Sequence, residues 1–424
     1  MNFNENDLLE GAHPLEEKNS FAEGIQLEGC PSRCPGCKHR DWSALASEKQ
    51  KSDWIKRVLE PWQGVIEPLQ RVEEFRRFHY RKKVCLHAEW MSGVWNFGLR
   101  VRKKPLAESL DLSATNDSHA SKQSHLSFET EVIPIPNCPI QSKNIQALLD
   151  VLSQRLPSSD RLPLVYLSVS GALLTLVIKS QEIDPSLCHA LVQEYDWSQW
   201  GIQGVWVNLN PSAGHRVFSP RGWRLIWGKE RVQEGGFFYG PDSFQQLIPE
   251  LHQHSLDQVK EFFLESHRSP GVIKSFAVMD LCSGVGRSLK EWQSFCVPTV
   301  GVELSGDAVR CLSLNVSDSL ILRGKASQRI PQLNEWKESY SGVDLYAYLN
   351  PPRLGLETEI THWLTHQARP LKVAYLSCSA GTLKRDLEMF SNANYRVMRV
   401  IPYDFFPRTH HVETLVLLER KEDF

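Results

Sequence analysis

The stretch Phe276-Ala-Val-Met-Asp-Leu-Cys-Ser-Gly-Val-Gly286 decides the fold, because an apolar run of strand length passes directly into a glycine-containing turn. Three more apolar runs of similar length follow, PTVGVEL at 298–304, VDLYAYL at 343–349 and VAYLSCS at 373–379. Helix-like segments with polar faces separate these runs. Such alternation of buried strands and amphipathic helices predicts an α/β fold with a doubly wound, Rossmann-like parallel sheet.

The N-terminal half has a different character. Short β-like runs dominate it, VCLHAEW at 84–90, GVWNFGLRV at 93–101, LVYLSVSG at 164–171, ALLTLVIKS at 172–180 and GVWVNLN at 204–210. Helices are expected at 41–59 and 140–156, and a Ser-rich surface loop at 106–130. We therefore expect a flexible leader at 1–29, a β-rich region at 30–235 and the Rossmann-like domain at 236–424.

Composition limits the class of protein. The chain has 424 residues, 41% hydrophobic and 23% charged, with a formal net charge of -2, which is ordinary for a globular protein. No segment approaches the ~20 consecutive apolar residues of a membrane span, and the polar N-terminus does not resemble a secretory signal. We expect a cytoplasmic protein, in which the ten cysteines would not form a disulfide framework.

A nucleoside pocket is expected around the glycine turn. Gly284 and Gly286 follow the strand at its carboxyl end, where ligands bind in parallel sheets. About twenty residues later Glu303 ends the next predicted strand, and a carboxylate at that place can accept both ribose hydroxyls. This spacing alone does not separate NAD from S-adenosylmethionine.

Three further segments carry a family resemblance. They are Asn350-Pro-Pro-Arg353, Tyr375-Leu-Ser-Cys378-Ser-Ala-Gly-Thr-Leu-Lys-Arg-Asp386 and Asp404-Phe-Phe-Pro407-Arg-Thr-His-His411-Val-Glu413. With them the sequence resembles the RNA uracil-5-methyltransferase family, class I S-adenosylmethionine-dependent enzymes that modify tRNA or 23S rRNA. The resemblance covers nearly the whole chain and is strongest at 243–420.

The resemblance implies a reaction and a set of site residues. Uracil C5 is a poor nucleophile, and addition of a thiolate to C6 converts the ring into an enolate that can attack a methyl sulfonium. The family assigns the thiolate to Cys378 and the base that removes the C5 proton to Glu413. The positions that would bind the cofactor are Gln246, Cys282, Gly284, Glu303 and Asn350.

Position 350 departs from the family, which carries aspartate there. Asn-Pro-Pro also begins loops in methyltransferases that act on exocyclic amines, but amine methylation needs no cysteine nucleophile. An RNA-binding protein that has lost catalysis is the alternative from another class.

A cysteine motif opens the β-rich region. Cys30, Cys34 and Cys37 have the spacing C-x3-C-x2-C, which is also the spacing of radical S-adenosylmethionine enzymes. Cys138 matches the fourth ligand of the iron–sulfur members of the uracil methyltransferases, so the resemblance implies a closed [4Fe-4S] cluster. Zinc bound by the same four cysteines is an alternative from chemistry alone.

A basic stretch at 71–104 suits RNA. It contains ten Lys or Arg and three acidic residues, with interleaved aromatics. The alternative is a solvated basic face beside core aromatics. We expect a monomer that binds RNA and no membrane. The iron–sulfur members of the family act mainly on 23S rRNA, which places 23S rRNA ahead of tRNA as the expected substrate.

Overall fold

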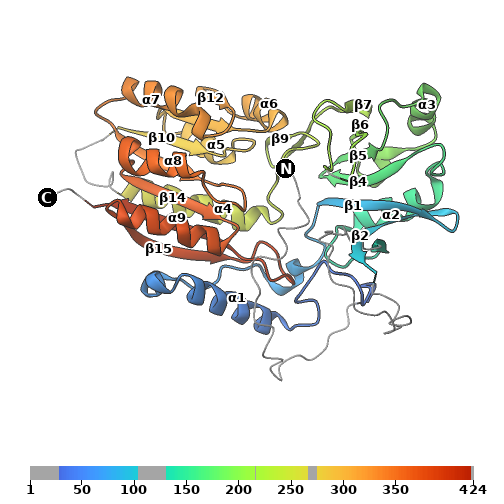
Figure 1. Cartoon of the computed structure of the whole chain (residues 1–424), viewed down its shortest axis with the longest axis horizontal. Coiled ribbons are helices and arrows are strands. Elements are labelled where there is room, and N and C mark those ends of the chain that lie inside the picture. Colours follow the sequence, from blue (N-terminus) through green and yellow to red (C-terminus); the bar gives the residue numbers. More distant parts are fainter. Residues whose placement is uncertain (1–27, 104–129, 215, 266–274, 422–424) are drawn as a thin grey trace, which may run out of the picture.

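Two seven-stranded sheets form two lobes that lie side by side (Figure 1). The computed structural model describes residues 28–103, 130–214, 216–265 and 275–421. Nearly all of the predicted leader and of the predicted Ser-rich loop lies outside these residues. Among the described residues, no helix has the length and apolar character needed to cross a membrane.

The C-terminal sheet is the predicted Rossmann-like sheet. Its strands, in spatial order, are β12 (Ser319–Arg323), β11 (Thr299–Glu303), β10 (Phe276–Leu281), β13 (Asp344–Leu349), β14 (Lys372–Ser377), β16 (Glu413–Arg420) and β15 (Tyr395–Tyr403). The first five run parallel, and β16 pairs antiparallel with both β14 and β15. The predicted parallel sheet is thus confirmed, with an antiparallel edge that the apolar pattern did not reveal.

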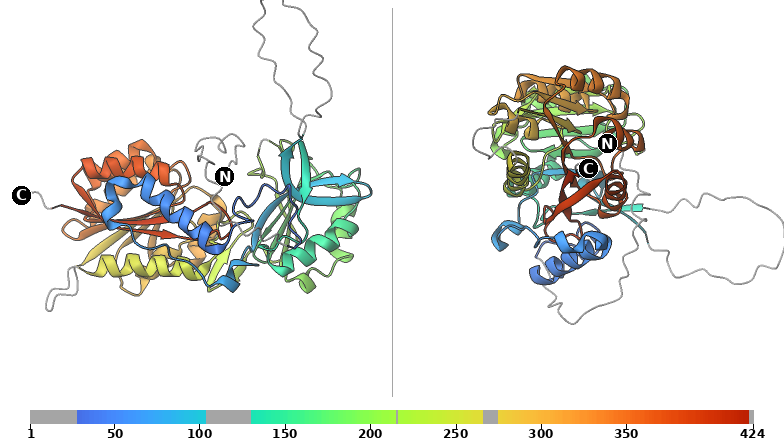
Figure 2. Two further views of the ribbon diagram at one scale, coloured as in Figure 1. Left: turned by 90° about the horizontal axis from the view of Figure 1, so that it is seen from below. Right: turned by 90° about the vertical axis from the view of Figure 1, so that its left-hand side faces the viewer.

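Helices cover both faces of this sheet (Figure 2). Phe276 and Val278 belong to the apolar core under α4 and α5, whereas Ala277 and Met279 belong to the core under α7, α8 and α9. This alternation is the two-residue period of a strand buried on both sides. The helices of this lobe are α4 (Pro249–Leu264), α5 (Arg287–Gln293), α6 (Gly306–Asn315), η6 (Ser327–Arg329), α7 (Ile330–Ser339), α8 (Thr358–Trp363), the π-helical η7 (Leu364–Ala368) and α9 (Ala380–Asn392).

The N-terminal sheet is mainly antiparallel. Its spatial order is β3 (Thr130–Pro134), β2 (Val94–Arg102), β1 (Lys83–Met91), β4 (Leu164–Ser170), β5 (Leu173–Ile178), β6 (Gly204–Leu209) and β7 (Trp223–Gly228). Only β5 and β6 of these described strands pair in parallel. The accompanying helices are α2 (Lys143–Arg155), α3 (Pro185–Gln193) and η4 (Trp197–Trp200). The hairpin of β8 (Val232–Glu234) and β9 (Phe237–Tyr239) follows this sheet in the chain.

The segment 44–77 packs on the C-terminal lobe, although it precedes the N-terminal sheet in sequence. It comprises α1 (Ala44–Val58), η2 (Glu60–Val65) and η3 (Glu74–Arg77). Ile55 and Leu59 lie in the core between the C-terminal sheet and α9, and Ile66 pairs with Val400 of β15. This segment therefore belongs to the core of the C-terminal lobe, and the predicted domain boundary at 235 stays a prediction. The apolar stripe of α1 predicts a buried face, but periodicity does not say which lobe covers it.

Candidate active site

The loop after β10 has an unusual backbone. Cys282, Gly284 and Gly286 have φ values of 70°, 56° and 89°. A Cβ atom at Gly286 would collide with the Leu312 side chain, so only glycine fits there. By contrast, the space where a Cβ of Gly284 would lie is open to 4 Å among the described residues, so the backbone is accessible to a ligand on that side.

Glu303 is fixed beside this loop, as the sequence predicts. It is the last residue of β11, and its Oε2 accepts from the Gly284 N–H at 2.9 Å and its Oε1 from the Ser305 N–H at 2.6 Å. Burial raises the pKa of this carboxyl, while the backbone donors oppose that shift. Each oxygen keeps a lone pair, so the carboxylate can still accept two hydroxyls.

Asp280 is a buried acid under the same loop. The Ser288 hydroxyl donates to its Oδ2, while Oδ1 is buried without a hydrogen-bond partner in the described part of the chain. Burial raises the pKa of this carboxyl to about 7. We use the name cofactor loop for the turn after β10, which contains Cys282 and Gly284, together with the carboxyls of Asp280 and Glu303 beside it. Its open backbone and spare acceptors fit a nucleoside-bearing cofactor.

The strand register brings the two predicted catalytic residues together. Cys378 follows β14 directly, and Glu413 is the first residue of β16. Ser377 and Thr414 form the last pair of this antiparallel ladder, so Cys378 follows that pair on one strand and Glu413 precedes it on the other. The two side chains interact electrostatically. The predicted nucleophile and the predicted base are therefore neighbours at one edge of the sheet.

Two further side chains complete this group, which we name the reaction site. The Gln246 amide donates from Nε2 to Glu413 Oε2 at 3.1 Å. Arg353 interacts electrostatically with both Cys378 and Glu413. The predicted contact of Gln246 with the cofactor stays a prediction, because its described partner is the carboxyl of Glu413.

Burial controls the ionisation of the reaction site. It raises the pKa of the Glu413 carboxyl to about 7, against the opposing effects of the Gln246 amide and Arg353. Burial, followed by the charge of Glu413, raises the pKa of the Cys378 thiol to about 11, and Arg353 opposes the rise. Arg353 is thus the cation that favours the thiolate. Catalytic acids and bases are characteristically buried and perturbed in this way.

The loop that carries Asn350 and Arg353 is fastened at both ends. The Asn350 N–H donates to the Leu281 carbonyl at 3.2 Å, which ties this loop to the cofactor loop. The Thr382 hydroxyl of α9 lies 3.1 Å from the Arg353 carbonyl oxygen and 3.2 Å from that of Ser379. The segments that carry Arg353 and Cys378 therefore meet at one side chain.

The four motif cysteines lie near one another but do not form a recognisable metal site. Cys37 interacts electrostatically with Cys138, Cys34 and Cys30, and burial raises the pKa of its thiol to about 12. Within the described ranges, no group of three or more Cys, His, Asp or Glu is arranged to hold a metal ion. The predicted [4Fe-4S] site is therefore not confirmed, and no reaction step is assigned to it.

The basic stretch is partly internal. The buried aromatics Tyr80, Trp95 and Phe97 belong to apolar cores, as the alternative to RNA docking predicted. Several basic side chains bind within the protein: Arg71 and Arg77 to Glu48, Arg76 to Glu250, Lys82 to Glu234 and Lys83 to the Ser243 carbonyl. RNA contact by this stretch stays a prediction for the remaining basic residues.

Comparison with known proteins agrees with the geometry. Residues 336–421, which contain Arg353, Cys378 and Glu413, match the family model of the tRNA (uracil-5-)-methyltransferases. In this C-terminal part the chain is similar to the tRNA (uracil-5-)-methyltransferases.

Curated relatives extend the match over most of the chain. A protein of Nostoc sp. described as an uncharacterized RNA methyltransferase is 26% identical over 95% of this chain and 87% of the relative. A relative of Clostridium acetobutylicum with the same description is 26% identical over 59% of this chain, and the match spans 54% of that relative.

A solved structure shares the fold. The tRNA (uracil-54, C5)-methyltransferase of Pyrococcus abyssi, in complex with S-adenosyl-L-homocysteine, superposes with a TM-score of 0.63 over 91% of this chain and 86% of that chain, at 18% identity. At this identity the likeness shows a common fold.

Some residues of the site were not assigned a role from sequence. Arg353 stands inside a quoted motif, so its place could have been noticed. Asp404 also stands inside a quoted motif, but its buried partner Lys51 carries no local signal, because the two residues are 353 positions apart and meet only in the folded chain.

Proposed function

We propose that this chain is an S-adenosylmethionine-dependent RNA methyltransferase that acts on C5 of uridine, with Cys378 as nucleophile and Glu413 as base. One observation carries the proposal. The pairing of β14 with β16 brings the Cys378 thiol within electrostatic range of the buried Glu413 carboxyl, whose pKa is about 7, and Arg353 interacts with both groups. Methylation of an exocyclic amine would require no such thiol.

The reaction follows from these positions. After the Cys378 thiol loses its proton to solvent, Sγ adds to C6 and the C5=C6 electron pair moves to C5 and the C4 carbonyl as an enolate. C5 then accepts a methyl group. Glu413 removes the C5 proton, the released electron pair restores C5=C6, and the Sγ–C6 bond breaks to regenerate the thiolate. A carboxyl of pKa about 7 is suited to accept a proton near neutral pH.

The cofactor loop supplies the second half of the site. When bound, S-adenosylmethionine supplies an electrophilic methyl group, and its sulfur keeps the electron pair of the broken S–CH3 bond as the neutral thioether of S-adenosyl-L-homocysteine. Glu303 would accept the ribose hydroxyls, and the open backbone at Cys282 and Gly284 would admit the rest of the cofactor. Two further residues would face the same ligand. Asn350 is hydrogen-bonded to the end of β10, and Gln246 is hydrogen-bonded to Glu413. These residues bind and orient, whereas Cys378 and Glu413 make and break bonds.

The substrate is a uridine that leaves its stack. Cys378 is half-buried and can reach C6 only if the base enters the site alone. We propose structured RNA as the substrate class. We place 23S rRNA ahead of tRNA as the substrate because of the resemblance of the cysteine motif to the iron–sulfur members of the family. A test for the cluster therefore also bears on the choice of substrate.

The decisive experiment measures transfer of a labelled methyl group to RNA. We expect the purified protein to form 5-methyluridine, identified by nucleoside mass spectrometry, and Cys378→Ala to form none. Comparison of rRNA and tRNA from a strain with and without the gene identifies the target. Loss of one 5-methyluridine from 23S rRNA, or from tRNA, names the substrate. A different modified nucleoside, or full activity of Cys378→Ala, would contradict the proposal.

A further inference from the structure

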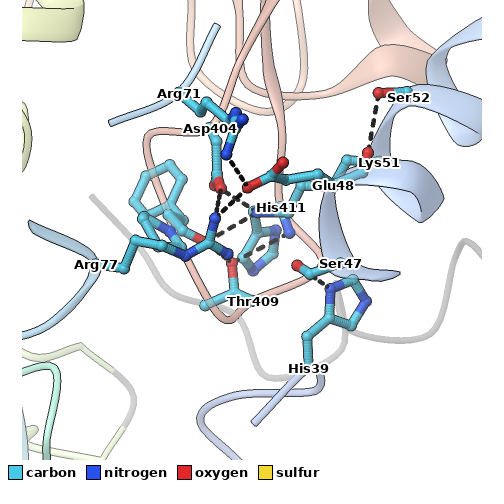
Figure 3. A network of polar contacts seen from close by, with 12 residues as sticks. His39, Ser47, Glu48, Lys51, Ser52, Arg71, Arg77, Asp404, Thr409 and His411 are labelled. Atoms are coloured by element: carbon cyan, nitrogen blue, oxygen red, sulfur yellow. Dashed lines mark hydrogen bonds and ion pairs between the residues drawn. The ribbon is translucent and has the colours of Figure 1, made fainter. Parts of the chain in front are cut away.

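A buried ion pair joins the N-terminal segment to the loop that precedes Glu413 (Figure 3). Lys51 of α1 lies 2.5 Å from Asp404 Oδ1 and donates to the Phe406 carbonyl at 3.1 Å. The side chains of Lys51 and Asp404 are 0% and 1% exposed. Asp404 is the first residue of the connection between β15 and β16; residues 404–411 of this connection are here called the loop, and Glu413 follows them by two residues.

Other charges enclose the same carboxylate. The Arg77 guanidinium lies 3.9 Å from Asp404 Oδ2 and 2.5 Å from Glu48 Oε1. Glu48 also pairs with Arg71 at 3.3 Å. Figure 3 shows the side chains of Lys51, Arg77 and Glu48 gathered around Asp404, with Arg71 beside Glu48. The carboxylate is thus held between two cations of the N-terminal segment.

The backbone of the loop is bonded to the same part of the chain, which, taken as residues 39–80, is here called the N-terminal segment. The Tyr80 hydroxyl donates to the Pro407 carbonyl at 3.1 Å, and the Arg408 carbonyl accepts from the His39 N–H at 3.1 Å. The Arg408 guanidinium lies 4.3 Å from the centre of the Phe78 ring. Arg408 itself has φ of 67°, a left-handed conformation that is costly for a residue with a side chain. The N-terminal segment therefore stabilises a strained loop.

A stability role alone does not account for this arrangement. Replacement of a buried ion pair by apolar residues of similar size is often neutral or stabilising, because desolvation offsets the attraction. Charged partners with directional hydrogen bonds instead define one geometry. Here that geometry sets where β16 begins, and hence where the carboxyl of Glu413 lies relative to Cys378.

We propose that Lys51 and Asp404 are positioning residues, which hold the loop at 404–411 so that Glu413 meets the C5 proton of the substrate. This inference rests on the proposed function. It assigns to α1, which precedes the N-terminal sheet in sequence, a part in one step of the reaction. Misplacement of a reacting group by ~1 Å can cost about 10²-fold in rate.

The chemistry offers a way to isolate that step. Addition of Cys378 to C6 and attack of C5 on the methyl group do not require removal of the C5 proton. In RNA that carries 5-fluorouridine at the target, C5 holds fluorine in place of that proton, so elimination stops and a methylated covalent adduct remains. Adduct formation thus reports the early steps, and turnover on ordinary uridine reports all of them.

The test uses the full-length double variant Lys51→Met with Asp404→Asn, which removes both charges together and keeps similar volumes. We expect an unchanged RNA KM and an adduct rate within about twofold of wild type, but turnover reduced by about tenfold or more, with covalent adduct accumulating on ordinary RNA. The matched control is Lys49→Met with Asp53→Asn, an exposed pair on the same helix (side chains 76% and 47% exposed), which should change neither rate.

Each outcome bears on the proposal. Parallel loss of adduct formation and turnover, or no loss of either, would overturn it. If the double variant does not fold, Tyr80→Phe, which removes only the hydrogen bond to the Pro407 carbonyl, should show the same selective loss, and its absence there would also overturn the proposal. A wild-type protein that forms neither adduct nor 5-methyluridine would instead contradict the proposed function.

Discussion

The cofactor loop and the reaction site are built in different ways. The cofactor loop comes from neighbouring turns, and its main contact joins Gly284 to Glu303 across 19 residues. In the reaction site, the hydrogen bond between Gln246 and Glu413 joins residues 167 positions apart. The supporting ion pair between Lys51 and Asp404 joins residues 353 positions apart. The cofactor loop needs only two adjacent parallel strands to form. The reaction site and its supporting ion pair need segments that are far apart in the sequence to pack against one another.

This difference has a functional meaning. A self-contained cofactor loop should bind its ligand whether or not the distant segments are intact. The reaction site should fail one step at a time as its supports are removed. The predictions below separate ligand binding from bond formation, and they run from the largest expected effect to the smallest.

Removal of the nucleophile should separate the two regions completely. Cys378→Ala should lose methyl transfer to the background rate, because no other described thiol opposes Glu413. Binding of S-adenosyl-L-homocysteine, measured by calorimetry, should stay within about twofold of wild type, since the contact of Glu303 with Gly284 is untouched. Loss of that binding would show that the two regions are not independent.

Removal of the base should stop the reaction later. Glu413→Gln should lower turnover by about 10²–10⁴-fold, the usual contribution of a general base, and covalent adduct should accumulate. In wild type the carboxylate is the active form, so the rate at which preformed adduct on ordinary RNA is resolved should rise about fivefold from pH 6 to pH 7, as the group with pKa about 7 loses its proton. The same rise in Glu413→Gln would assign the titration to another group.

A change in the cofactor loop should affect binding first. Glu303→Ala should weaken S-adenosyl-L-homocysteine by about 10- to 100-fold, because hydrogen bonds to a charged group contribute about 1.5–3 kcal/mol. At saturating cofactor, adduct formation on 5-fluorouridine RNA should be nearly restored. Glu338→Ala, at an exposed acid of α7, is the control and should change neither quantity. A rate that stays low at saturation would mean that Glu303 also shapes the reaction site.

The buried ion pair should also be visible in stability. Lys51→Met alone leaves the Asp404 charge buried, and it should lower the free energy of unfolding in urea by about 3–5 kcal/mol. Addition of Asp404→Asn should recover most of that loss. A double variant as unstable as the single one would mean that the lysine stem, and not its charge pairing, supports the loop.

The cysteine motif should have the smallest effect on the chemistry. If it holds a [4Fe-4S] cluster, anaerobically purified protein should contain iron and acid-labile sulfide, and Cys30→Ala should lose both while it still forms the adduct with 5-fluorouridine RNA. Protein that contains zinc and no sulfide would favour the zinc alternative. Protein that contains neither iron nor zinc would contradict the predicted metal site. Reductive cleavage of S-adenosylmethionine that depends on Cys30 would identify radical chemistry.

Local patterns predicted much of the fold. The apolar runs at 276–281 and 343–349 became β10 and β13, and the expected helices at 41–59 and 140–156 contain α1 and α2. Strands and helices of this kind can be predicted because the spacing of apolar residues along the sequence indicates which face of the element is buried. The packing of α1 on the C-terminal lobe was not predictable in this way, because any apolar surface of the right shape would satisfy its stripe.

The residues of the site also differ in how far the sequence predicted them. Gly284 and Glu303 were identified from a short spacing, and Cys378 and Glu413 from a family resemblance. The hydrogen bond of Gln246 to Glu413, the charge of Arg353 beside both reacting groups and the support from Lys51 depend on contacts across the fold. A single sequence does not encode such contacts in any local period.

The central claim is that the Cys378 sulfur bonds to C6 of a uridine. The most direct measurement is mass spectrometry of the protein after incubation with S-adenosylmethionine and RNA that carries 5-fluorouridine. We predict a stable adduct of protein, RNA and one added methyl group, with the linkage on the peptide that contains Cys378. The absence of an adduct, or a linkage at another cysteine, would contradict the account.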